Sequence, residues 1–386
     1  MIAERVLKRR HAAVTVDQRA EVDNPKLDLQ IGQVREIGVQ RGELGGELLR
    51  GEAPVEVRVR RLHAFDEITQ VFADTLADLA RKDERIVAIT AAMPDGTGLD
   101  RFAKEFPSRT FDVGICEQHA VLFAAGMATQ GLKPVCAIYS TFLQRAYDQV
   151  FHDVSLMDLP VVFALDRGGV VGADGPTHHG AYDLSYLRVF PNMHVAAPKD
   201  ENELRGLLAT ALALGRPVAI RYPRGAGHGV ALDPEPKPLP VGKGEVLRIG
   251  KDGVVFAIGD PVLPALRAAE RLAAEGGASL GVVNARWVKP IDTELVSQLV
   301  KPGTTVLTVE ENAVAGGFGS AVSESLDVRG IAAPVHRLGI PDRFVPHATQ
   351  AEQRAELGID EDGLLAAFRA RTAGAGVVPI RARVAS

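Results

Sequence analysis

Apolar positions along the chain recur with two periods, and these periods predict alternating helices and strands. In residues 65–82 every third or fourth side chain is apolar, which is the spacing of one buried helical face. Residues 86–90 are apolar almost throughout, which is typical of a strand buried on both faces of a sheet. Because such runs alternate with helical segments along the chain, the sequence predicts an α/β fold with a parallel sheet covered on both faces.

The predicted elements form two series. The first has helices at 65–82, 99–105, 117–130, 142–154 and 201–214, and strands at 86–90, 110–113, 134–139, 160–166 and 218–222. The second has strands at 253–259, 278–284 and 304–310, and helices at 262–275, 292–300 and 319–327. Between them, residues 233–240 carry proline at every second position, which can continue neither a helix nor a central strand. A domain boundary is therefore expected there.

This boundary divides the chain into five predicted segments. Glycines interrupt any helical period in the first segment, which is expected to be a poorly defined extension. The segments are an extension at 1–61, a first α/β domain at 62–230, a proline-rich linker at 231–240, a smaller α/β domain at 241–372 and a tail at 373–386.

Composition and charge narrow the class of protein. The formal net charge of -5 gives no electrostatic reason to expect nucleic acid or a membrane surface as a partner. No apolar run reaches membrane-spanning length, and the first residues lack the apolar core of a signal peptide, so a cytoplasmic location is expected. Cys116 and Cys136 both lie in apolar runs, which predicts two buried, unpaired thiols.

A glutamate at the start of a predicted helix is the first candidate for chemistry. Glu117 follows an apolar strand in the run Asp112-Val-Gly-Ile-Cys-Glu-Gln-His119. Taken alone, a carboxylate in the first turn of a helix is better explained by its favourable interaction with the helix dipole. The alternative is a buried carboxyl group that contacts a cofactor, and the motifs that follow along the chain favour it.

Two further motifs combine aromatic, basic and loop residues. The first is Tyr139-Ser-Thr-Phe-Leu-Gln-Arg145, in which Phe142 suits a flat heterocycle or a plain hydrophobic core. The second is Gly172-Ala-Asp-Gly-Pro-Thr-His-His-Gly180, whose glycines let the backbone approach a ligand closely. Adjacent histidines on one loop rarely both bind a metal and no third ligand is evident, so no metal site is predicted.

These three segments, in this order and spacing, resemble the 1-deoxy-D-xylulose-5-phosphate synthase family. The resemblance also covers Thr90-Ala-Ala-Met-Pro-Asp-Gly-Thr-Gly98 and Arg221-Tyr-Pro-Arg-Gly225, and it continues to Ala355-Glu-Leu-Gly358. Transketolases and the beta subunits of 2-oxoacid dehydrogenases share the architecture. The resemblance therefore implies a transketolase-like pyrimidine-binding domain followed by a transketolase C-terminal domain.

The resemblance also implies roles for eight residues toward thiamine diphosphate and the substrates. Glu117 matches the carboxyl group that hydrogen-bonds the aminopyrimidine of the cofactor, and Phe142 matches the aromatic residue stacked on it. Tyr139 and Arg145 line the same pocket. Asp174 and His178 match residues that position the substrate and transfer protons. Arg167 and Arg224 match the pair that binds the phosphate of glyceraldehyde 3-phosphate, and both follow predicted strands, where ligands of open parallel sheets bind.

The implied reaction condenses pyruvate with glyceraldehyde 3-phosphate and releases CO2, which supplies a precursor for isoprenoid and thiamine synthesis. Members of the family also hold Mg2+ with the diphosphate through a Gly-Asp-Gly motif, and they form homodimers. No Gly-Asp-Gly occurs in this sequence, so Mg2+ is expected with the cofactor but its ligands are not expected in this chain.

Four interpretations are open. The chain is half of a split synthase completed by a separate diphosphate-binding subunit, a truncated product, a non-catalytic interaction protein that keeps the fold, or a beta-type subunit of a 2-oxoacid dehydrogenase. Glu117, Phe142, His178 and Arg224 are all present. Their presence favours a split synthase or a truncated product over an interaction protein, which has no need of them.

Overall fold

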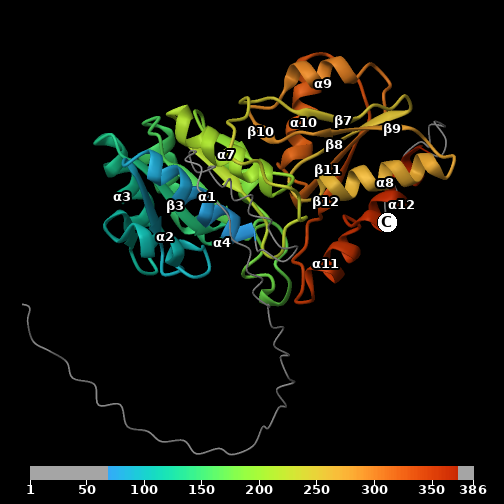
Figure 1. Ribbon diagram of the computed structural model, residues 1–386. Coiled ribbons are helices and arrows are strands. Elements are labelled where there is room, and N and C mark those ends of the chain that lie inside the picture. Colours follow the sequence, from blue (N-terminus) through green and yellow to red (C-terminus); the bar gives the residue numbers. More distant parts are fainter. Residues whose placement is uncertain (1–67, 373–386) are drawn as a thin grey trace, which may run out of the picture. The chain divides into compact units, whose positions relative to one another are not determined.

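The computed structural model describes residues 68–372 (Figure 1). The predicted extension at 1–61, the start of the predicted helix at 65–82 and the tail at 373–386 lie outside the described residues. Within residues 68–372, helices and strands alternate along the chain and form two sheets, so the predicted α/β class is confirmed. In this part of the chain no helix is both long and apolar enough to cross a membrane.

The first sheet has seven strands in the order β10-β5-β6-β4-β3-β1-β2. Six of them are parallel to their neighbours: β1 (Ile86–Thr90), β2 (Thr110–Asp112), β3 (Lys133–Tyr139), β4 (Val162–Asp166), β5 (His194–Ala196) and β6 (Val218–Arg221). The edge strand β10 (Trp287–Lys289) runs antiparallel to β5. The predicted parallel sheet is therefore correct except at this edge.

Helices cover both faces of the first sheet. Helices α1 (Ile68–Lys82), α2 (Leu99–Glu105) and α7 (Glu201–Leu214) bury apolar side chains in one core, together with alternate residues of the strands. Helices α3 (Glu117–Thr129) and α6 (Asp183–Leu187) contribute to the core on the opposite face. Strands buried on both faces explain why their sequences are apolar throughout.

The second sheet has five strands in the order β12-β11-β8-β9-β7. These are β7 (Glu245–Arg248), β8 (Gly253–Ala257), β9 (Leu280–Asn284), β11 (Val306–Ala313) and β12 (Val335–Ile340). Only β7 is antiparallel to its neighbour. Helices α8 (Val262–Ala274) and α12 (Glu361–Thr372) pack side by side on one face, and α9 (Thr293–Leu299) and α10 (Phe318–Val328) lie on the other (Figure 1). Helix α11 (Gln350–Leu357) precedes α12.

Several features differ from the sequence prediction, among them short elements that were not predicted, such as β5, α6 and α11. The single helix expected at 142–154 is instead a series of short turns, with α4 (Ser140–Leu143), α5 (Tyr147–Gln149) and a π-helical turn over Val150–Ser155. Strand β10 follows the proline-rich linker in sequence but pairs with the first sheet. Cys116 is exposed, so the prediction of two buried thiols holds only for Cys136. The predicted domain boundaries themselves stay a prediction.

Candidate functional site

The site lies where neighbouring strands of the first sheet end. Tyr139 is the last residue of β3, Arg167 directly follows β4, and Arg224 comes three residues after β6. These three strands are adjacent and parallel in the sheet. Their carboxyl ends therefore meet at one edge, which is where open parallel sheets bind ligands.

Glu117 begins α3 and has one carboxylate oxygen without a partner. Its side chain is only 2% exposed. Oε1 accepts a hydrogen bond from Nη1 of Arg145 at 2.8 Å, whereas no group in residues 68–372 hydrogen-bonds Oε2. Buried polar atoms in folded proteins are almost always hydrogen-bonded, and an unpaired one is costly. Glu117 therefore fits a ligand that offers a donor to a carboxylate, as N1′ of an aminopyrimidine does in its protonated or imino form.

The ring of Phe142 connects this carboxylate to the rest of the site. Phe142 stacks on Tyr139 with ring centres 5.4 Å apart, and the guanidinium of Arg145 lies 5.1 Å from the Phe142 ring. The imidazole of His178 meets the same ring edge-on at 5.3 Å. This partly buried aromatic surface, which Arg145 links to Glu117, suits a flat heterocycle, so the residues present fit thiamine diphosphate at its pyrimidine end.

Arg167 is held tightly beneath Tyr139. Its guanidinium lies 3.8 Å from the centre of the Tyr139 ring, and Nη1 donates to Oδ1 of Asp166 at 3.0 Å and to the carbonyl of Gly96 at 2.8 Å. The backbone of Arg167 has a φ of 60°, which is uncommon for a residue with a side chain. Such conformations cluster at functional sites.

Burial shapes the electrostatics of this part of the site. Burial raises the pKa of Asp166 to about 6, although Arg167 and the hydroxyl of Thr69, which donates to Oδ2 at 2.7 Å, act in the opposite direction. Burial likewise raises the pKa of the Tyr139 hydroxyl, and the charges of Arg167, Asp174 and Arg224 all act on it. Tyr139 therefore lies among the charged groups that were predicted to bind substrate.

The glycine-rich loop brings Asp174 and His178 to the same place. Asp174 ends a 3₁₀ turn, and its carboxylate accepts from Nη1 of Arg224 at 2.7 Å. His178 is partly buried, with Nδ1 2.9 Å from the hydroxyl of Thr177. The Arg224 side chain is 41% exposed, against 14% for that of Arg167, which leaves Arg224 the more accessible cation.

The eight predicted residues thus form one connected group. Contacts of Phe142 join Glu117 and Arg145 to His178, and contacts of Tyr139 join Phe142 to Arg167. Arg224 and Asp174 complete the group. The structure therefore brings all of them together, while the role of each stays a prediction.

Sequence reasoning missed residues that shape the site from a distance. A Cβ atom at Gly96 would lie 1.9 Å from the Tyr139 hydroxyl oxygen, so only glycine fits there. The imidazole of His347 lies against Gly175, where an added Cβ would be 2.2 Å from Nε2. Gly96 falls within one of the strings that carry the family resemblance. No local pattern marks His347, because it lies far along the chain from the loop that it contacts.

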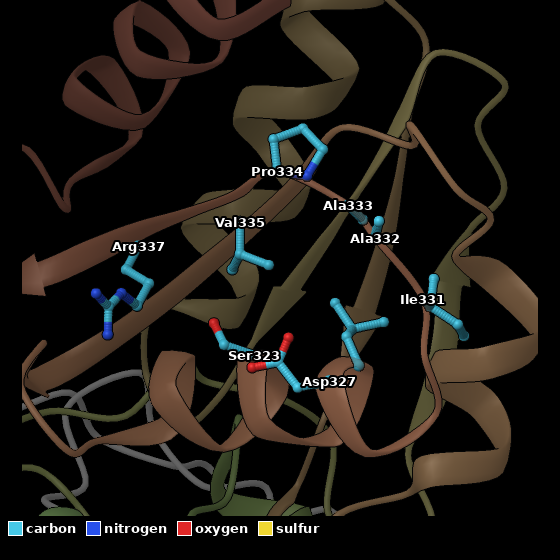
Figure 2. Close-up of a pocket in the computed structure, with 9 residues that line it drawn as sticks. Ser323, Asp327, Ile331, Ala332, Ala333, Pro334, Val335 and Arg337 are labelled. Carbon is cyan, nitrogen blue, oxygen red and sulfur yellow. The ribbon is translucent and has the colours of Figure 1, made fainter. Parts of the chain in front are cut away.

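A cavity of about 570 Å³ lies elsewhere, between α10 and β12. Figure 2 shows Ser323 and Asp327 on α10 pointing toward Val335 on β12. Its lining contains none of the eight predicted residues. The size of a cavity alone does not identify this protein's chemistry.

Comparison with known families defines first the class of protein. Residues 67–228 match the family described as transketolase, pyrimidine binding domain, and residues 242–364 match transketolase, C-terminal domain. The carboxylate and aromatic ring described above lie in the first of these regions. The chain belongs to the transketolase family.

Individual relatives are more specific. The chain is 62% identical over 309 residues to 1-deoxy-D-xylulose-5-phosphate synthase 1 of Geobacter sulfurreducens, covering 80% of this chain and 48% of that protein. It is 61% identical over 304 residues to the 1-deoxy-D-xylulose-5-phosphate synthase of Syntrophus aciditrophicus, covering 78% of this chain and 46% of that one. The chain thus spans about half the length of these curated relatives.

A solved structure matches over nearly its whole length. It is described as a split gene transketolase, inactive beta4 tetramer, and it superposes with a TM-score of 0.70 at 31% identity. The match covers 80% of this chain and 98% of that one.

Proposed function

We propose that this chain is the pyrimidine-binding and C-terminal part of a 1-deoxy-D-xylulose-5-phosphate synthase, which condenses pyruvate with glyceraldehyde 3-phosphate and releases CO2. The observation that carries the proposal is the buried Oε2 of Glu117, which has no partner among the described residues, while Oε1 is paired with the arginine that lies over the ring of Phe142. Identity of 62% to a protein of that name supports the choice of reaction within the transketolase family.

Glu117, Phe142 and Arg145 would hold the pyrimidine end of thiamine diphosphate. When bound, the cofactor would supply a carbon nucleophile for the keto group of pyruvate and a sink for the electron pair left by CO2. Arg145 binds Oε1 of Glu117, so Oε2 would be available to the ring nitrogen of the cofactor. Phe142 and Tyr139 offer a stacked aromatic surface to the flat ring.

Arg224, Arg167, Asp174 and His178 would act on the substrates. A guanidinium stays charged and donates in a planar fork that matches phosphate, so we assign the two arginines to glyceraldehyde 3-phosphate. Asp174 accepts from Arg224 and orients its guanidinium. His178 hydrogen-bonds Thr177 through Nδ1, which leaves Nε2 to exchange a proton with the substrate.

The diphosphate and its Mg2+ are assigned to a separate diphosphate-binding half. The sequence lacks Gly-Asp-Gly, and a diphosphate desolvated without a cation is electrostatically unfavourable. Calorimetry of the purified chain with thiamine diphosphate and Mg2+ tests this assignment. We expect weak binding and no turnover, and tight binding with CO2 release from pyruvate would refute it.

Complementation tests the reaction itself. The probe is the half of the Geobacter sulfurreducens relative that this chain does not cover, mixed with this chain, pyruvate and glyceraldehyde 3-phosphate. Formation of 1-deoxy-D-xylulose 5-phosphate is expected. Transfer of the pyruvate carbons to a lipoyl acceptor instead would favour the 2-oxoacid dehydrogenase interpretation.

A second candidate state is an inactive assembly of this chain with itself. The solved relative that this chain covers over 98% of its length is described as an inactive beta4 tetramer. We propose that the chain forms homodimers when complemented and larger assemblies when alone. Sedimentation with and without the added half checks this: an unchanged, monomeric species in both would contradict it.

A further inference from the structure

Helix α11 contacts the glycine-rich loop of the candidate site, residues 168–180. Gln353 of α11 is fully buried, and its Oε1 accepts from the N–H of Gly172 at 2.9 Å. Its Nε2 donates back to the carbonyl of Gly172 at 3.1 Å and to the carbonyl of Pro346 at 2.8 Å. One side-chain amide therefore binds both polar groups of a single loop residue.

Gln350 lies one turn earlier on the same helix and contacts two parts of the site. Its Nε2 donates to the carbonyl of Val170 at 2.9 Å and to the carbonyl of Arg224 at 3.3 Å. Residues three apart face the same side of a helix, so both glutamines reach the loop together. Gln350 thus links the loop to the backbone of the proposed phosphate-binding arginine.

A buried carboxylate from the second sheet completes these contacts. Oε1 of Glu311, on β11, accepts from the N–H of Val170 at 3.1 Å. Arg354 of α11 pairs with both oxygens of Glu311, at 3.1 and 3.2 Å, and with Asp260 at 3.1 Å. Removing the charge partner of a buried carboxylate is strongly destabilising, so Arg354 keeps Glu311 available to the loop.

Every backbone polar group of the three residues 170–172 is therefore bound by a side chain. The N–H of Val171 donates to Nδ1 of His179 at 3.1 Å, and its carbonyl accepts from Arg224 at 3.1 Å. The remaining four groups are bound by Glu311, Gln350 and Gln353. These three residues precede the turn that carries Asp174, so side chains set the position of that turn.

We propose that Gln353 and Gln350 are positioning residues for the substrate side of the site, through which α11 fixes the loop that carries Asp174 and His178. Neither glutamine touches substrate in this proposal, which rests on the proposed function only for the chemistry that the loop performs. The arrangement also gives the C-terminal half of the chain a part in the reaction. Without Gln353, the buried N–H of Gly172 loses its hydrogen-bond partner, and its carbonyl keeps only the N–H of Gly175, at 3.1 Å.

Hydrogen exchange of the purified full chain tests the proposal without cofactor or activity. The variants are Gln353→Met and Gln350→Met, which keep the length of the side chain and remove its hydrogen bonds. Exchange in residues 168–180 is expected to accelerate about tenfold or more relative to α8. Glu356→Gln is the matched control, because Glu356 lies on the same helix and pairs only with Arg343 at the surface among the described residues.

A second control distinguishes a local effect on the loop from a general loss of stability. Leu365 is buried against α8 and the second sheet, so Leu365→Ala lowers stability without removing a contact of the loop. If Gln353→Met accelerates exchange of the loop and of α8 equally, as Leu365→Ala should, the glutamine is merely structural and the proposal is wrong. Unchanged exchange in the loop would also overturn it.

Kinetics of the complemented enzyme give the functional outcome. For Gln353→Met we expect KM for glyceraldehyde 3-phosphate to rise about tenfold or more and KM for pyruvate to change much less. An equal rise for both substrates would contradict the positioning role. Absence of activity in the wild type as well would count against the proposed function, while the exchange result would still decide whether α11 holds the loop.

Discussion

At the scale of single residues, the site keeps arrangements that a stable fold would avoid. Glu117 buries a carboxylate oxygen that no group in residues 68–372 hydrogen-bonds, and Arg167 adopts a φ of 60°. Both features cost free energy in the isolated chain. Because both occur where the resemblance places function, they are better explained by ligand binding than by the helix dipole or by core packing.

Replacement of Glu117 should therefore separate activity from stability. Glu117→Gln removes the buried charge and an ion pair to a half-exposed arginine, which contributes little. We expect the melting temperature to stay equal or rise, while kcat of the complemented enzyme falls by about 100-fold or more. Circular dichroism and steady-state kinetics check this. Full activity in the variant would show that Glu117 serves only to interact favourably with the helix dipole.

Gly96 should tolerate no side chain. In Gly96→Ala the new Cβ would lie 1.9 Å from the Tyr139 hydroxyl oxygen and 2.9 Å from the ring, so Tyr139 must move away from Arg167. Activity and stability should both fall, and Gly96→Ala/Tyr139→Phe should recover part of the stability.

The matched control for this change is Gly126→Ala. Gly126 lies in α3 with open space around its Cβ position, and alanine is the better helix former. The stability of Gly126→Ala should equal or exceed that of the wild type. Equal stability of Gly96→Ala and the wild type would show that the Tyr139 position adapts freely.

Arg224 should affect one substrate only. Loss of one charge-assisted contact to phosphate is worth roughly 1.5–3 kcal/mol, so Arg224→Ala should raise KM for glyceraldehyde 3-phosphate by about one to two powers of ten. KM for pyruvate, which has no phosphate, should be nearly unchanged. Kinetics with each substrate varied in turn decide it. A parallel loss for pyruvate would mean that Arg224 supports the fold or the cofactor.

At the scale of elements, buried polar side chains join helices to strands that no local pattern connects. Glu310 on β11 accepts from the backbone N–H groups of Phe318, at 2.7 Å, and Gly319, at 2.8 Å, at the start of α10. These N–H groups have no partner within the helix. A carboxylate from the sheet therefore caps α10, where the helix dipole also favours a negative charge.

This cap predicts a pH dependence of stability. Burial raises the pKa of Glu310 from 4.5 to about 7, although the two backbone hydrogen bonds act in the opposite direction. Between pH 4.5 and about 7, folding therefore takes up a proton at Glu310. The contribution of Glu310 to stability is fully present below pH 4.5 and is lost as pH rises through about 7. The side chain in Glu310→Gln cannot ionise. As pH rises from 5 to 8, the free energy of unfolding of this variant should therefore fall less than that of the wild type.

Chemical denaturation at several pH values measures this difference. Glu270→Gln is the matched control, because Glu270 is exposed on α8 and its replacement should leave the pH profile of the wild type unchanged. Identical pH profiles for Glu310→Gln and the wild type would contradict the assignment.

At the scale of the whole molecule, one hydrophobic cluster extends from the first sheet to the second. The largest core cluster includes residues of β3 and α3 together with residues of β8 and α10. Strand β10 from the second half of the sequence completes the first sheet, and its Trp287 is fully buried. Residues 68–372 should therefore unfold as one cooperative unit.

Trp287 is the single tryptophan of the chain and so reports on this junction. We expect its fluorescence and the far-ultraviolet circular dichroism signal to change at the same denaturant concentration. Trp287→Phe keeps a large apolar side chain there and should lower that midpoint while preserving a single transition by circular dichroism. Two separate transitions in the wild type would show that the two sheets fold independently.

The sequence by itself determined the class of fold, and it nominated the residues of the candidate site. Long buried strands and amphipathic helices have periods that can be read locally, so β1, α2 and α7 begin and end where they were predicted. Family strings located Glu117, Phe142 and the two arginines, although not what each does.

Only the tertiary structure decided the rest, because the missing elements depend on distant partners. Strands such as β5 and β10 have three residues and acquire their conformation by pairing with each other, so they leave no periodic signal. The predicted helix at 142–154 breaks into turns that place Phe142 between Arg145 and His178. The contacts of Gln353 with Gly172 join residues 181 positions apart. The spacing of apolar residues along a helix or strand depends on local backbone geometry and can be read from the sequence. Which distant polar groups form hydrogen bonds depends on how the elements pack.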